Sequence, residues 1–134
     1  MSQVIDVIKT LPKLARVGHI ADEIINDAER QLSLNFSNEY KEYLSEFGAI
    51  SAKGIELTGI IEVDYCNVVS VTQQEWKLNP SVPHTMHVVE NTFVDGVIIW
   101  QDANGVVYAT RPNKSPIQIA NSLAEYITLR CKKD

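Results

Sequence analysis

The hydrophobic spacing of this chain changes near Gly48, and that change limits the folds open to it. Before Gly48, apolar residues recur three and four positions apart, which is the period of amphipathic helices. After it come short apolar and β-branched runs, and the last segment returns to helical spacing. This order predicts an α+β fold with N-terminal helices, a central, mainly antiparallel sheet, and a C-terminal helix packed on that sheet.

Three helices are predicted in the first third of the chain. The first spans residues 4–11 and the second spans residues 20–32. The third has the clearest signals, because Ser37 is a favourable N-cap, Glu39 suits the first turn, and Gly48 can adopt the left-handed conformation that ends a helix. Its apolar stripe has i, i+3, i+4, i+7 spacing and consists of Tyr40, Tyr43, Leu44 and Phe47.

The rest of the chain predicts strands and a closing helix. Asn104-Gly105, between two β-prone runs, is a strong hairpin signal because both residues accept positive φ. Residues 68–78 are ambiguous, and we favour a strand or turn that runs into a helix. Ser122 and Glu125 resemble a capping box for a last helix that begins near Asn121. The predicted strands cover residues 54–59, 86–90, 97–100, 106–110 and 116–119.

Length and composition are those of one globular domain. The 134 residues are 45% hydrophobic and 22% charged, and no linker or repeat divides them, so a single domain over residues 1–134 is expected. The N-terminus lacks the basic and apolar regions of a signal peptide, and no apolar stretch reaches the length of a membrane span. With two unpaired cysteines, Cys66 and Cys131, these features favour a cytoplasmic protein with reduced thiols.

The net charge of −5 bears on the class of partner. An acidic surface repels phosphate groups, which argues against nucleic-acid binding, and it would attract a basic partner. No apolar span or basic surface suggests a membrane partner.

The candidate metal and cofactor motifs are weak. His84-x-x-His87 has metal-like spacing, but its third ligand would have to come from Cys66, Glu90 or Asp95, and no motif fixes that choice. We therefore interpret both histidines as solvent-exposed loop residues and predict no metal site. The six glycines form no phosphate-binding loop, so no cofactor is predicted either.

Catalytic candidates are equally unspecific. Acid pairs occur at Asp22/Glu23, Glu62/Asp64 and Asp95/Asp102, but sequence spacing does not place two carboxylates in one cleft. Cys66 could pair with His19 or His84, although its flanking residues match no nucleophile signature, and an inert thiol is the simpler interpretation. The sequence thus predicts no catalytic residue, and a small hydrolase built on an acid pair or on Cys66 is a minor alternative.

A recognition surface is the stronger hypothesis. Trp100 lies within an apolar run and is expected in the core, whereas Trp76 has polar neighbours and is expected to be more exposed. Exposed aromatic residues often anchor protein interfaces, and acids would complement a basic partner. The predicted partner-binding residues are Glu56, Glu62, Asp64, Tyr65, Trp76, Glu90 and Asp95.

The order of several motifs over residues 20–128 resembles the SUKH superfamily, whose founding domain is of the cell-wall-assembly-regulator type. The motifs are an Ala-Glu-x-x-Leu helix, a Phe-x-x-x-Tyr-x-x-Tyr-Leu-x-x-x-Gly helix, a strand ending in glycine, an Asp-x-Asn-Gly hairpin and a final helix. They lie at Ala28–Leu32, Phe36–Gly48, Ile55–Gly59, Asp102–Tyr108 and Ser122–Ile127.

This resemblance implies a non-enzymatic protein that resembles bacterial immunity proteins, which remain in the cytoplasm of the producing cell and neutralise a cognate toxin, often a nuclease. An acidic inhibitor would be steered to the basic substrate groove of a nuclease. A regulatory interaction module of the cell-wall-assembly-regulator type is the alternative that the same resemblance implies. The sequence leaves open whether the protein forms a homodimer.

Overall fold

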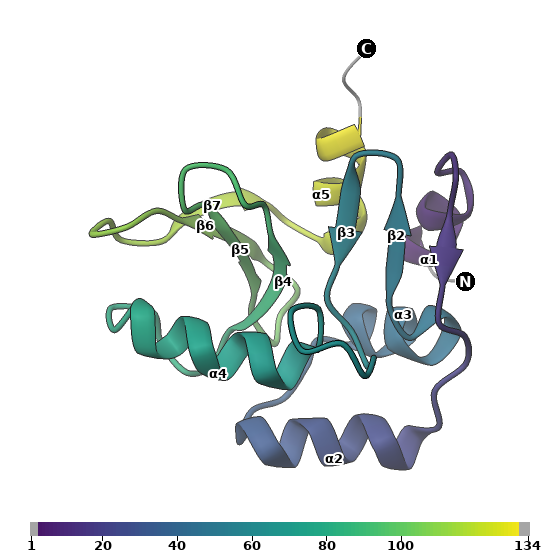
Figure 1. Cartoon of the computed structure of the whole chain (residues 1–134), viewed down its shortest axis with the longest axis horizontal. Helices are drawn as coiled ribbons and strands as arrows, with labels where there is room; N and C mark the ends of the chain where they lie inside the picture. The colour runs from purple at the N-terminus through teal and green to yellow at the C-terminus, as the bar shows by residue number, and fades with distance from the viewer. Residues whose placement is uncertain (1–2, 132–134) are drawn as a thin grey trace.

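The structure is a computed structural model that describes residues 3–131. Within this range the chain forms five helices and two antiparallel sheets (Figure 1). The sequence also predicts that Lys132 and Lys133 lie near the negative C-terminal end of the last helix, but both residues are outside the described range. The helices are α1 (Gln3–Lys9), α2 (Asp22–Leu32), α3 (Asn38–Phe47), α4 (Val68–Leu78) and α5 (Leu123–Cys131).

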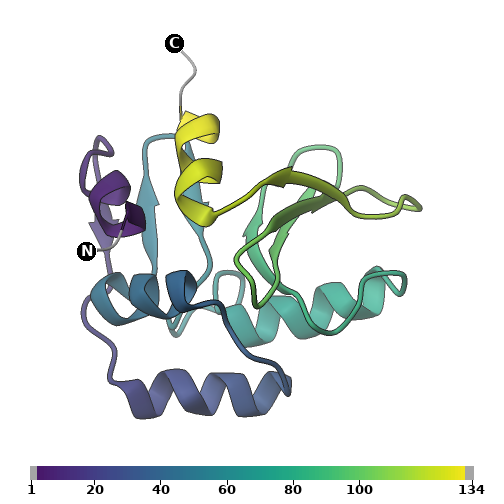
Figure 2. The same cartoon turned by 180° about the vertical axis from the view of Figure 1, so that it is seen from behind.

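The strands divide between a small sheet and a larger one. The first sheet has the order β1-β2-β3, and the second is a β4-β5-β6-β7 meander that curves over α4 (Figure 2). The two sheets meet where the Thr58 amide, just after β3, donates to the Val89 carbonyl at 2.8 Å. The strands are β1 (Ala15–Arg16), β2 (Ile50–Ala52), β3 (Ile55–Leu57), β4 (His87–Asn91), β5 (Ile98–Gln101), β6 (Val107–Thr110) and β7 (Ile117–Ala120).

This architecture confirms the predicted α+β class with a C-terminal helix on the sheet. The larger sheet contains the predicted strands after α4, whereas β1 and β2 were not predicted. In place of the two positive-φ residues expected for the hairpin turn, only Gly105 has positive φ, at 92°. The Asp102 carboxylate holds this turn by accepting from the Asn104 and Val106 amides.

Local chemistry explains the ends of the helices. Ser37 caps α3 as predicted, because its hydroxyl accepts from the Tyr40 amide at 2.9 Å, and Gly48 follows with φ of 75°. For residues 68–78, the predicted strand or turn before the helix was wrong, because the whole segment forms α4. The Asn67 side chain accepts from the Val69 and Ser70 amides, and this N-cap prevails over the β-propensity of the valines.

Two apolar clusters form the core. The larger joins α1, α2, α3 and α5 to both sheets, and the stripe of α3 lies fully inside it, as predicted. The smaller lies between α4 and the second sheet and contains Trp100, which is fully buried and donates to the Thr110 hydroxyl at 2.9 Å. Within the described range, no helix is both long and apolar enough to cross a membrane.

Glu39 links three elements through its carboxylate. One oxygen accepts from the Leu123 amide at 2.6 Å and from the Gln101 side chain at 2.9 Å, and the other accepts from the Ala124 amide at 2.9 Å. The two amides belong to the first turn of α5, where donors lack intrahelical partners and negative charge is favourable. Glu39 therefore caps α5 from α3, in addition to the predicted Ser122 hydroxyl, which accepts from the Glu125 amide.

Replacing Glu39 with alanine is expected to lower the free energy of unfolding by about 2 kcal/mol, because two helix amides and a buried glutamine lose their acceptor. Urea unfolding at neutral pH would measure this loss. Glu42→Ala is the matched control, since Glu42 is an exposed acid on the same helix. Equal stability of the two variants would contradict the assigned role of Glu39.

Candidate functional site

The segment between β3 and α4 carries three of the predicted contact residues. Glu62, Asp64 and Tyr65 are all exposed there, and Tyr65 is 56% exposed. The Tyr65 hydroxyl donates to Glu56 on β3 at 3.1 Å, which ties this segment to β3. Hydrogen bonds with Cys66 and Glu56 raise the pKa of Tyr65 to about 12, so the phenol is neutral at physiological pH. The structure thus brings four predicted residues together.

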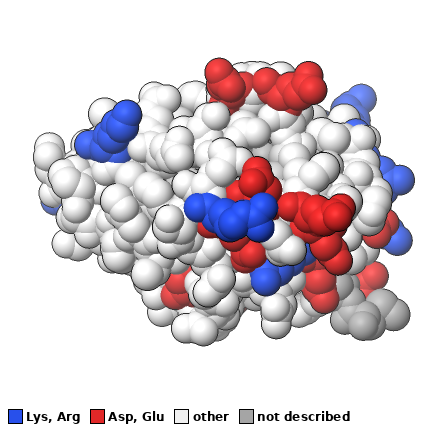
Figure 3. Space-filling view, turned by 90° about the horizontal axis from the view of Figure 1, so that it is seen from below, with Lys and Arg blue, Asp and Glu red and all other residues white. Residues whose placement is uncertain are grey.

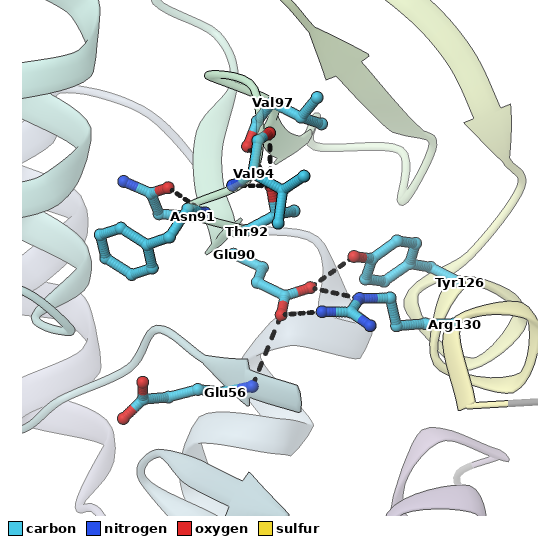
Figure 4. Close-up of polar contacts among 9 residues, drawn as sticks. Glu56, Glu90, Asn91, Thr92, Val94, Val97, Tyr126 and Arg130 are labelled. Carbon is cyan, nitrogen blue, oxygen red and sulfur yellow. Dashed lines mark hydrogen bonds and ion pairs between the residues drawn. The ribbon is translucent and has the colours of Figure 1, made fainter. Parts of the chain in front are cut away.

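A second exposed segment, between β4 and β5, presents apolar side chains to solvent. Phe93 is 69% exposed and Val94 is 60% exposed. Phe93 has φ of 57° and the predicted contact residue Asp95 has φ of 55°, a conformation that bulky residues rarely adopt. The side chains of Asn91 and Thr92 hold this loop by accepting from the Phe93 and Val94 amides, and Thr92 also donates to the Val97 carbonyl (Figure 4).

The two segments meet at one cleft beside α4, which we name the α4 cleft. Tyr65 and Phe93 both line it, so the most exposed aromatic residues of the two segments share one surface. The remaining lining residues are Asp64, Ser70, Val71, Gln74, Glu75 and Asn91. Exposed apolar atoms, aromatic rings and acids in one place are the chemistry of a protein-interaction surface.

The charge near this cleft is negative. Glu62, Asp64 and Asp95 are exposed acids on the two segments, and Glu75 adds a carboxylate from α4. The neighbouring helix α2 also carries exposed acids, and acidic and basic side chains lie side by side near the middle of the face seen from below (Figure 3). The acids that line and flank the α4 cleft therefore favour a cationic partner.

The profile of the SMI1-KNR4 cell-wall family, SUKH_5, matches residues 1–130. The chain belongs to this family. The match confirms the SUKH resemblance of the sequence motifs, and members of the family are generally non-catalytic immunity or regulatory proteins. No curated protein matches the chain with significant sequence similarity.

Two predicted contact residues of this SUKH protein are less accessible than expected. Glu90 is only 2% exposed, and its carboxylate binds Arg130, Tyr126 and the Glu56 amide (Figure 4). It joins α5 to both sheets and is not a free surface acid. Trp76 is half-buried, because its indole donates to the Met86 carbonyl at 3.1 Å and packs against the core.

His84 and His87, the two histidines with metal-like spacing, occupy different environments. His84 is exposed and stacks on Trp76 with ring centroids 4.1 Å apart. The prediction that His87 is an exposed loop residue was wrong, because His87 begins β4 and is fully buried against Phe36 and Tyr40. Its pairing with Gln101 in the sheet places it among these rings, and sequence spacing could not show this. Within residues 3–131, no group of three or more His, Cys, Asp or Glu residues could hold a metal ion.

The residues considered for a hydrolase are in environments that do not favour catalysis. The Cys66 thiol is buried and donates to Glu56 at 3.4 Å, and burial raises its pKa to about 11, so it is protonated at neutral pH. The Asp102 carboxylate already accepts hydrogen bonds from two backbone amides of its own turn. Asp64 and Glu75 do share the α4 cleft, a pairing that the sequence did not predict.

Sequence reasoning missed Phe93 and Glu75 at this cleft, and it missed the exposed Val94 next to Phe93. A usable signal exists for the first two, since Phe93-Val94 is an apolar tip between the turn formers Asn91-Thr92 and Asp95-Gly96. Glu75 has no comparable signal, because only the packing of α4 decides which of its polar residues lies at the cleft.

Proposed function

We propose that this SUKH protein is an immunity protein that binds and neutralises a cognate bacterial toxin by direct contact, with a nuclease as the first candidate. The observation that supports this most is the loop that exposes Phe93 and Val94 beside Tyr65 and several acids, with a strained, positive φ at Phe93. Such strain costs about 1–3 kcal/mol per residue and persists where function requires it. Burial of this apolar tip by a partner would offset the cost.

The acidic surroundings suggest where on the toxin the protein binds. A nuclease holds its substrate with basic side chains, and a protein with net charge −5 would be attracted to that groove over a long distance. Binding there would block the substrate directly. In this proposal the protein acts in the cytoplasm of the toxin producer, with neither nucleic acid nor membrane as its partner.

The alternative function is regulation by protein contact, which the cell-wall description of the family favours. The same surface could serve it, since an interaction module also needs exposed aromatic residues. The gene neighbourhood separates the two functions. A toxin gene beside this one supports immunity, whereas a group of wall-synthesis or signalling genes supports regulation.

The test is co-expression with the toxin domain encoded beside the gene. The wild-type protein should protect cells and form a stable complex with the toxin. If the folded protein neither protects the cells nor forms a complex with the toxin, the immunity function is refuted.

Phe93→Ala is expected to weaken the affinity for the toxin about thirtyfold, because truncating a central aromatic anchor typically costs about 2 kcal/mol or more. Isothermal titration calorimetry would measure the change. Ile24→Ala is the control, since Ile24 is a half-exposed apolar residue of α2 outside the α4 cleft. If Ile24→Ala weakens binding and Phe93→Ala does not, the interface lies on another face.

A further inference from the structure

Glu75 combines low residue exposure with the lack of a cationic partner. It is only 8% exposed, in the last turn of α4, where the helix dipole disfavours negative charge. The Asn79 side-chain amide donates to its Oε1 at 3.1 Å, whereas Oε2 accepts no hydrogen bond from residues 3–131 and remains accessible to solvent. In the same range no Lys, Arg or His nitrogen comes within 4.0 Å of the carboxylate. Burial accordingly raises the pKa of Glu75.

A partly desolvated carboxylate without a cation is less favourable than a fully solvated one, and an open cleft allows a partner to supply the cation. Glu75 lines the α4 cleft together with Asp64, so two acids are available to one guest. Tyr65 and Phe93 line the same cleft with exposed rings. Two separate costs, the unpaired charge of Glu75 and the strained backbone of Phe93, therefore lie at one place.

We infer that the α4 cleft receives an arginine side chain of the partner, with the guanidinium against Glu75 and the aromatic rings of Tyr65 and Phe93. The inference rests on the proposed function for the identity of the protein that carries the arginine. It does not depend on that function for the chemistry of the cleft.

The chemistry favours arginine over lysine. A guanidinium is planar and weakly hydrated, it can stack on aromatic rings, and it can donate two parallel hydrogen bonds to one carboxylate. The Asn91 and Gln74 side chains of the cleft could satisfy its remaining N–H groups. An ammonium is a compact, strongly hydrated charge that would make less use of the rings.

The direct test uses the protein alone and the probe arginine methylamide, followed by chemical shifts in an NMR titration. Saturable shifts confined to the residues of the α4 cleft are expected, with affinity in the millimolar range for so small a ligand. Citrulline methylamide, the neutral isostere, should cause no such shifts, and lysine methylamide should bind more weakly. Equal binding of citrulline would overturn the role of charge, and equal binding of lysine would overturn the assignment to a guanidinium.

Glu75→Gln is expected to weaken arginine binding at least about tenfold, because a charge-assisted hydrogen bond becomes a neutral one. The variant should keep the Asn79 contact and should melt no lower than the wild type, since it removes an unpaired buried charge. Asp95→Asn is the control, because Asp95 is an exposed acid that does not line the cleft. Unchanged binding by folded Glu75→Gln would overturn the inference.

The pH dependence gives a second readout. Protonated Glu75 cannot pair with a cation, so the affinity for arginine should fall as the pH drops through the raised pKa of this carboxyl. Binding that is independent of pH down to the ordinary glutamate range would overturn the inference. Failure of the toxin to bind the wild-type protein would refute the proposed function alone, because the titration with arginine methylamide needs no toxin.

Discussion

Lowering the pH from about 7 to about 4 is expected to reduce the free energy of unfolding by about 3 kcal/mol through His87 alone. The ring is fully buried, and its Nδ1 lies 3.2 Å from the Val88 carbonyl oxygen. Since a carbonyl only accepts, Nδ1 carries the proton of the neutral ring. Nε2 has no hydrogen-bond partner within residues 3–131, so a second proton there would be buried without an acceptor.

The sign follows from the two protonation states. Burial lowers the pKa of His87 to about 3 in the folded protein, while the unfolded chain keeps a value of about 6.5. Between these values the unfolded chain binds the proton and the folded protein does not, so acid favours unfolding. The stability is complete above about pH 6.5 and is lost progressively toward about pH 3.

Urea unfolding of the wild type and of His87→Leu over this pH range would isolate the contribution, because leucine is apolar, does not titrate and is similar in size. Other groups also titrate in acid, so the difference between the two proteins is the quantity to compare. The wild type should lose about 3 kcal/mol more than the variant between about pH 7 and about pH 4. Parallel curves would show that His87 accepts a proton without unfolding.

The sequence predicts well those elements whose signals are local. Ser37 at the start of α3 and Gly48 at its end act within one helical turn, and the chain order of β4 to β7 follows from short apolar runs and turns. It does not predict β1 and β2, because strands of two and three residues are too short to show a period. They exist because distant segments pair, as between Val17 and the Ala49 carbonyl.

The candidate site is predicted in part for the same reason. Glu62, Asp64 and Tyr65 lie close together in the sequence, so they also lie close together in the fold. Placing Phe93 beside Tyr65 requires the two sheets to be brought together at Thr58 and Val89, which no local pattern encodes. Glu90 shows the converse, because an acid in an apolar strand resembles a surface residue until its partner, 40 positions away on α5, is known.

Replacing Arg130 with alanine is expected to lower the free energy of unfolding by about 3 kcal/mol at neutral pH. Arg130 donates to both oxygens of Glu90, at 3.3 Å and 3.1 Å, and the Glu90 side chain is 3% exposed. Removing one partner of a buried ion pair leaves the other charge uncompensated, which costs about 3–5 kcal/mol. The lower end applies here because the Arg130 side chain is 32% exposed and partly solvated.

Two variants separate the lost charge from lost packing. Glu90→Gln should cost less than Arg130→Ala, because the exposed part of Arg130 can be hydrated while glutamine still accepts from Tyr126. The double variant Glu90→Gln/Arg130→Met should recover most of the stability, since no unpaired charge remains and methionine refills the space. A double variant as unstable as Arg130→Ala would contradict the assignment of the loss to an unpaired Glu90 charge.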